Sequence, residues 1–148
     1  MKRVKRFAVD TSCMVAAVCS WHEHHSKAAV EIDRRLDGGE QLCTPAPALV
    51  EAYAVLTRLP PPHRLSATDA WALVEGNFVS AATVIALSAD RLIELLGRAA
   101  RAEITGGRTY DYVIGECARE AAVDALLTFN RRHFDPAPAG VLVIEPGQ

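Results

Sequence analysis

The sequence predicts a three-layer α/β domain with a central parallel sheet of about five short strands. Short apolar segments alternate along the whole chain with longer segments of helical pattern, which is the element order of a sheet covered by helices on both faces. Two of the short segments, residues 125–129 and 141–144, are apolar except for Thr128. Strands that are buried on both faces of a parallel sheet have this composition.

In the first half of the chain, start and stop residues define the expected elements. The expected order is strand 7–9, helix from 11, helix 25–36, strand 41–44 and helix 48–59. Asp10 lies at the junction of the first strand and helix, where an N-cap residue is expected. The Gly38-Gly39 pair ends the second helix, and the prolines at 60–62 end the third.

The second half continues the alternation. The expected order is helix 66–79, strand 82–87, a helix from 90 to the glycine pair at 106–107, helix 110–121, and strands 125–129 and 141–144. Ser66 and Asp69 have the spacing of a capping box, which marks a helix start. Residues 82–87 are rich in β-branched side chains, which favour a strand.

Length, composition and charge limit the classes of protein that fit. The chain has 148 residues, half of them apolar, and its formal charge is −2, so we expect a single domain over residues 1–148 with no global attraction to nucleic acid or anionic lipid. The four cysteines form no CxxC pair, which favours a reducing, cytoplasmic setting over a zinc site or disulfides. No apolar run reaches the ~20 residues that span a bilayer, which argues against a membrane protein.

Three acidic residues lie where a sheet of this class collects ligands. Asp10 follows the first strand, although a helix N-cap alone would explain it. Glu51 is the single charge in the apolar segment ALVEAYAVL, and a carboxylate in such surroundings favours a cation partner over solvent. Asp111 is near a helix start, where the helix dipole favours an acid for any function.

Small residues extend the face of Asp111 along its helix. Gly115, Ala118 and Ala122 follow it at helical spacing, so this face should pack closely on another element, with the acid at its end. Three acids from three elements that meet at one crevice would form a divalent cation site.

Three segments of the sequence resemble the PIN domain, and more specifically the ribonuclease toxins of bacterial VapBC toxin–antitoxin modules. These segments are FAVDTS, TPAPALVEAYAVLTRLP and GGRTYDYVIGECAREAAVDALLTFNRRHF, and each contains one of the three acids. The resemblance extends over residues 7–144 and includes the LTR that follows the glutamate and the LLT that precedes RRHF.

The resemblance implies a metal-dependent endoribonuclease in which Asp10, Glu51 and Asp111 are catalytic and hold Mg²⁺ or Mn²⁺. Its expected products carry 3′-hydroxyl and 5′-phosphate ends. Oxygen ligands suit a hard ion such as Mg²⁺, and a bound ion activates water and reduces the charge on the scissile phosphate. The implied partners are an RNA substrate and a small VapB-like antitoxin, and a homodimer that forms larger complexes with the antitoxin is also expected.

One position departs from the family pattern. Many members have a fourth acid where this chain has Asn130, so a second metal site should be weaker and a single metal is favoured. Asp124 and Glu116 are nearby acids of second rank as metal ligands. The hydroxyls of Ser12 and Thr128 are expected to orient the carboxylates.

Basic residues near the expected site are interpreted as RNA contacts. Arg131, Arg132 and His133 follow the strand that ends at 129, and Arg108 and Arg58 are further candidates, although a solvated loop would also explain them. The cluster at residues 22–25 (HEHH) lacks the i, i+4 spacing of HExxH and is interpreted as a solvated helix start.

Two other functions are weighed against a metal-dependent nuclease. A phosphatase of the haloacid dehalogenase type needs D-x-D, but Ser12 stands two residues after Asp10. The alternative that fits the fold is a catalytically weakened PIN module that binds RNA or protein, in which Asn130 marks the lost acid.

Overall fold

A five-stranded sheet forms the centre of the computed structural model, which describes residues 3–148. The elements in chain order are β1 (Arg6–Val9), α1 (Thr11–Val18), α2 (His25–Asp37), β2 (Gln41–Pro45), α3 (Ala46–Thr57), α4 (Ala67–Phe78), β3 (Thr83–Ile85), α5 (Ala89–Arg101), α6 (Arg108–Glu120), β4 (Ala125–Leu127), the 3₁₀ helix η1 (Arg131–Phe134) and β5 (Leu142–Ile144). The predicted class, a parallel sheet of five short strands between helices, is therefore confirmed.

The strand order is β3-β2-β1-β4-β5, and every neighbouring pair is parallel. In the central strand, Ala8 is in register with Cys43 on one side and Leu126 on the other. The chain builds the sheet outward from β1 through β2 and β3, then crosses back to add β4 and β5 on the other side of β1. Crevices for ligands form at such a reversal, outside the carboxyl ends of the strands.

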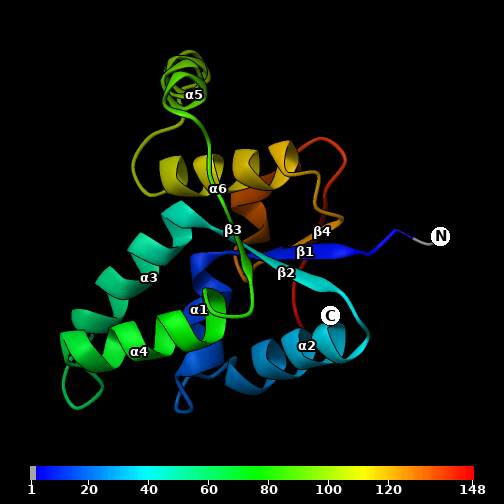
Figure 1. Ribbon diagram of the computed structural model, residues 1–148. Helices are drawn as coiled ribbons and strands as arrows, with labels where there is room; N and C mark the ends of the chain where they lie inside the picture. Colours follow the sequence, from blue (N-terminus) through cyan, green and yellow to red (C-terminus); the bar gives the residue numbers. More distant parts are fainter. Residues whose placement is uncertain (1–2) are drawn as a thin grey trace.

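Helices cover both faces of the sheet. Figure 1 shows the sheet almost edge-on, with α6 on one face and α2 on the other, while α5 lies on the outer side of α6. The helices α1 and α3 lie toward the carboxyl ends of β1 and β2 (Figure 1). Within residues 3–148, none of the helices has the length and apolar character needed to cross a membrane.

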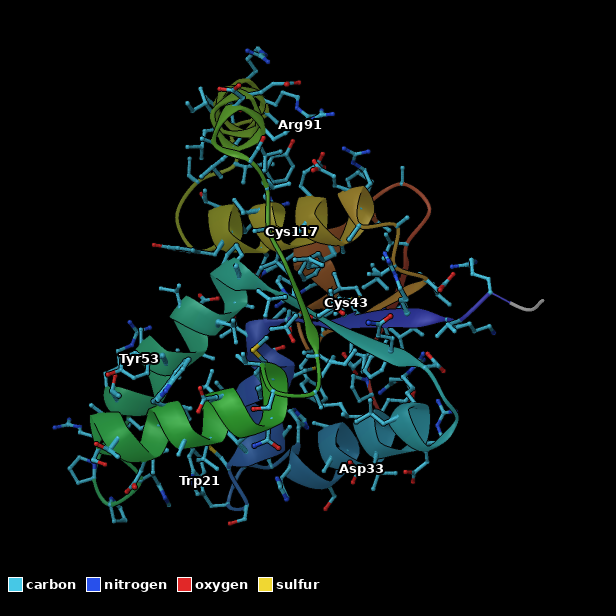
Figure 2. All side chains as sticks on the ribbon, viewed as in Figure 1. Trp21, Asp33, Cys43, Tyr53, Arg91 and Cys117 are labelled. Carbon is cyan, nitrogen blue, oxygen red and sulfur yellow. The ribbon has the colours of Figure 1, made fainter. Side chains whose placement is uncertain are left out.

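The core explains why the central strands are uniformly apolar. Phe7, Ala8 and Val9 of β1 and Leu126 and Leu127 of β4 have no exposed surface, because helices cover both faces of these two strands. The four cysteines are buried as free thiols, and Figure 2 shows Cys43 at the sheet and Cys117 on α6. Buried thiols of this kind act as small apolar side chains.

The structure differs from the expected elements in the exposure of the last strand and in the positions where two helices end. Leu142 is 64% exposed, because β5 is an edge strand and is not enclosed like β1. The helix expected to run from 90 to the glycine pair ends at Arg101, and Glu103 then adopts a positive φ of 56°. Ala122 also has a positive φ, of 54°, and lies beyond α6 rather than on its face. The helix η1 was not predicted.

Candidate functional site

Asp10 begins α1 directly after the central strand. Its backbone is extended, and its Oδ1 accepts hydrogen bonds from the Cys13 backbone N–H at 3.0 Å and from the Ser12 hydroxyl at 2.6 Å. Its Oδ2 accepts a hydrogen bond from the Thr128 hydroxyl at 2.5 Å. Asp10 is therefore an N-cap, as the simpler interpretation of the sequence suggested, and it also links α1 to the end of β4.

The two hydroxyls that were expected to orient carboxylates both contact Asp10. Each also accepts a hydrogen bond from the segment after β4: Ser12 Oγ from the Phe129 N–H at 3.0 Å, and Thr128 Oγ1 from the Asn130 N–H at 2.8 Å. Since β1 and β4 are adjacent strands, these bonds fix the Asp10 carboxylate at the reversal point of the sheet.

The environment of Asp10 disfavours its charged form. Burial is the main cause, and it raises the pKa of Asp10 from 3.8 to about 6, although the bonds from Ser12, Thr128 and Cys13 oppose this change. The negative charge of Asp111 raises the pKa of Asp10 further. A buried acid beside a second acid is an environment in which a bound cation would stabilise the ionised state.

Glu51 and Asp111 approach from two other helices. Glu51 lies in the middle of α3, and its Oε1 accepts a hydrogen bond from the Thr11 hydroxyl at 2.5 Å. Asp111 lies in the first turn of α6 and is 8% exposed, and its Oδ2 lies 2.5 Å from Nδ1 of His133. Each of these acids thus has a hydrogen-bond partner of its own at the site.

A cavity of about 520 Å³ joins these groups. It is lined by Thr11, Ser12, Val15, His22, Glu23, His24, Glu51, Val55, Gly107, Asp111, Phe129, Asn130 and His133. Asp10 is 1% exposed and is held behind this lining by Ser12 and by the buried Thr128. The structure therefore brings the expected acids, Ser12, Thr128 and Asn130 to the same end of the sheet.

The donor atoms suit a hard divalent cation, but the side chains do not yet converge on one point. Carboxylate and amide oxygens are the ligands of Mg²⁺ and Mn²⁺. Among the residues that the structure describes, no three His, Cys, Asp or Glu side chains stand close enough to share an ion. Glu51 is hydrogen-bonded to Thr11 and Asp111 to His133 in this arrangement. An ion at the site would bind these carboxylates together with their partners Thr11 and His133.

The two second-rank acids do not line this cavity, although Glu116 lines a smaller hollow together with Asp111 and His133. Asp124 precedes β4, at the opposite end of the strand from Thr128, and it forms an ion pair with Arg3 at 2.5 Å. Glu116 forms an ion pair with Arg119, which also keeps its pKa below the usual range. Each acid is thus occupied by a cation of the protein itself.

Of the basic candidates, His133 lines the cavity, whereas the four arginines lie beside it in the chain or border other hollows. Arg131 and Arg132 are exposed on η1 and border a separate hollow next to β5. Arg108 is exposed at the start of α6, directly after Gly107, which lines the cavity. Arg58 borders another hollow together with Glu51 and Tyr110.

The segment between α1 and α2 supplies a wall of the cavity that sequence reasoning missed. His22, Glu23 and His24 line the cavity, so the interpretation of this cluster as only a solvated helix start was incomplete. The ring of His24 stacks on Phe129, with centroids 4.5 Å apart, and this contact fixes the wall against the end of β4. The three histidines among residues 22–25 were a signal for a functional site. They were compared only with the i, i+4 spacing of HExxH metal sites, which they lack.

Comparison with known proteins identifies the family. Residues 7–138 match the family model of the PIN domain. The chain belongs to this family. It is also 39% identical over 119 residues to Ribonuclease VapC40 of Mycobacterium tuberculosis, which covers 80% of this chain and 83% of that protein. This identity places the PIN domain described here among the VapC proteins.

Solved structures agree with this placement at the level of the fold. The crystal structure of VapC20 from Mycobacterium tuberculosis, a toxin that cleaves the sarcin–ricin loop, matches with a TM-score of 0.68 and 18% identity over 92% of this chain and 98% of that one. VapBC2 of Rickettsia felis, bound to a DNA fragment from its promoter, matches with a TM-score of 0.66 and 15% identity, covering 95% and 98% of the two chains.

Proposed function

We propose that this protein is a metal-dependent endoribonuclease and the toxin of a type II toxin–antitoxin module. The observation that supports the proposal is that Asp10, Glu51 and Asp111, from three separate elements, lie at the same end of the sheet near its reversal point. The 39% identity to a protein named as a ribonuclease supports RNA as the substrate.

In this proposal, the three carboxylates would hold one Mg²⁺ or Mn²⁺ ion, and the amide oxygen of Asn130, a residue of the cavity lining, would assist. When bound, the ion lowers the pKa of a coordinated water and reduces the charge of the phosphate. Ser12 and Thr128 hold the Asp10 carboxylate in one orientation. Water attacks phosphorus and the bond to the 3′-oxygen breaks, which leaves 3′-hydroxyl and 5′-phosphate ends.

The rim arginines would bind the RNA backbone. Arg108, Arg131 and Arg132 are exposed next to a cavity whose lining includes Glu51 and Asp111. Phosphate groups are bound by guanidinium groups, whereas the acids alone would repel them. The bound cation and these arginines together would offset that repulsion.

Exposed apolar side chains fit the expected protein partners, a VapB-like antitoxin and a second copy of the chain. Val50 and Tyr53 on α3 and Trp71 on α4 border one apolar hollow, and Figure 2 shows Tyr53 near the periphery. Ile93 and Leu96 are exposed on α5. Surfaces of this kind mark protein contacts. The structural match to VapBC2 supports the antitoxin, and co-expression with the product of the adjacent gene, followed by co-purification, tests it.

The nuclease is tested by cleavage of structured RNA in Mg²⁺ or Mn²⁺. Because a bound ion stabilises the transition state by several kcal/mol, we expect D10N and E51Q to lower the cleavage rate about 100-fold or more. The matched control is D124N, which changes an acid at the opposite end of the sheet and should stay within about twofold of the wild type. Equal cleavage by all four proteins, with or without metal, would refute the proposal.

Asn130 is the observation that favours the second candidate, a PIN module that binds RNA or protein without cutting it. An amide in place of a fourth acid removes one negative charge from the cavity lining. Binding of Mn²⁺ and RNA by the wild type, without cleavage of any RNA tested, would support this candidate over the nuclease.

A further inference from the structure

His133 contacts one of the three acids directly. Its Nδ1 lies 2.5 Å from Oδ2 of Asp111, and its side chain is 37% exposed while that of Asp111 is 11% exposed. An ionised carboxylate only accepts hydrogen bonds, so with Asp111 ionised the proton of this bond belongs to Nδ1 of His133. The contact occupies Oδ2 of Asp111, so Oδ1 is the other oxygen through which this carboxylate could bind an ion.

The packing of η1 on α6 determines this contact. Gly115 follows Asp111 by one helical turn, and a Cβ atom at Gly115 would lie 3.1 Å from Cγ of Pro138 and 3.5 Å from the ring of Phe134. The absence of a side chain at Gly115 therefore lets Phe134 and Pro138 approach the helix. Phe134 is 5% exposed in this contact, and His133 is its neighbour in the chain.

A hydrogen bond within the turn adds to this constraint. The backbone N–H of His133 donates to the carbonyl of Asn130 at 2.9 Å, so the residue that replaces the family's fourth acid and the histidine belong to one turn. Asn130 and His133 both line the cavity. The turn thus contributes two hydrogen-bonding side chains to the cavity that Glu51 and Asp111 also line.

We propose that His133 is a positioning residue that holds Asp111 in the orientation needed to bind the divalent ion. This inference rests on the proposed nuclease function. A carboxylate whose second oxygen is fixed by an N–H group loses less rotational freedom when it binds metal, and removal of such partners costs about 10- to 100-fold in metal affinity or activity. His133 is not assigned contact with the substrate.

The test compares H133A, H133N and H133Q with the wild type. The amide nitrogen of Asn reproduces the position of Nδ1, whereas that of Gln reproduces Nε2, so only H133N preserves the donor to Asp111. We expect H133A and H133Q to weaken Mn²⁺ binding, measured by calorimetry on the full-length protein, by about tenfold. H133N should stay within about threefold of the wild type. The kcat for RNA cleavage should follow the same order, with little change in KM.

The controls separate this inference from the nuclease proposal. H63A removes a histidine that stacks on Trp21 outside the cavity lining, and it should leave Mn²⁺ affinity unchanged. If the wild type binds Mn²⁺ and cleaves RNA while H133A does both equally well, the inference about His133 is wrong and the nuclease stands. If H133N is as impaired as H133A, positioning through Nδ1 is also wrong. If the wild type neither binds Mn²⁺ nor cleaves RNA, the nuclease proposal fails and the inference about His133 fails with it.

Discussion

Asp10 meets two requirements at once, because it caps α1 and stands among the proposed metal ligands. Its cap role needs only an acceptor for the Cys13 N–H, which an amide also provides. Its metal role needs a charge that burial disfavours, as the raised pKa of about 6 shows. A neutral substitute should therefore keep the fold and remove the function.

D10N should be at least as stable as the wild type when metal is absent. At pH 8 the wild-type carboxylate is ionised, and a pKa raised from 3.8 to about 6 corresponds to about 3 kcal/mol of unfavourable free energy, part of which the lost hydrogen bonds to the charged group will offset. Thermal unfolding in EDTA measures this effect. Mn²⁺ should then stabilise the wild type and not D10N. A D10N variant that unfolds well below the wild type in EDTA would contradict this account.

At the scale of residues, sequence reasoning found the groups that follow strands and missed those that depend on turn geometry. Asp10 and Thr128 each follow a strand of the sheet, so parallel pairing of β1 with β4 brings them together. His133 reaches Asp111 only because η1 packs on α6, and no periodic pattern encodes a 3₁₀ turn after β4. His24 lies in a loop, to which hydrophobic periodicity does not apply.

The contact between α6 and η1 gives a prediction at the scale of elements. G115V should destabilise the protein by about 1–3 kcal/mol, because a side chain at this position meets Pro138 and Phe134, and it should also weaken Mn²⁺ binding by displacing His133. Urea unfolding and calorimetry measure the two effects. The matched control is G76A in α4, where a Cβ meets nothing within 4 Å and should stabilise the helix by up to about 1 kcal/mol. Equal stability of both variants would refute the argument.

Asp124 ties β1 to β4 at the end of the sheet opposite the cavity. It accepts hydrogen bonds from the Arg3 side chain and from the Arg6 backbone N–H, and these bonds hold its pKa below 3.8 in the folded protein. A depressed acid pKa stabilises the fold above the unfolded value and loses this effect as pH falls through the folded value. D124N should thus lower the urea midpoint at pH 7 and make less difference at pH 3. An equal deficit at both pH values would assign the loss to packing instead.

The element pattern was predictable because each strand and helix carries its own local signal. Ser66 and Ser88 cap α4 and α5 with their side chains, and Pro47 lies in the first turn of α3. The exposure of Leu142 could not be predicted, because an edge strand and an interior strand have the same apolar composition until the order of the sheet is known. The predicted end of α5 differs from the observed one at Arg101. The cap there is formed by the backbone N–H of Ala102, which donates to the carbonyls of Arg98 and Ala100, and a backbone cap leaves no signal in residue type.

For the whole molecule, the sheet order explains how a chain of net charge −2 would act on RNA. The sequence predicted no general attraction to nucleic acid, and that expectation still applies to the molecule as a whole. The reversal at β1 gathers acids at one end of the sheet, and Arg131 and Arg132 lie on η1 directly after β4. Electrostatic attraction of RNA would therefore be confined to this end of the sheet and would depend on Arg131 and Arg132.

The rim contribution is measured by the salt dependence of RNA binding. Each phosphate contact with a single strand contributes about 0.7 to the slope of log affinity against log salt, so R131A/R132A should reduce the slope by about 1.4 and raise KM while kcat changes little. K5A/R34A is the control, because it removes the same charge from a residue just before β1 and a residue in the last turn of α2, neither of which lines the cavity. Equal slopes for the two double variants would show that only net charge matters. A lower kcat for R131A/R132A would instead place these arginines in the chemistry, since η1 also carries His133.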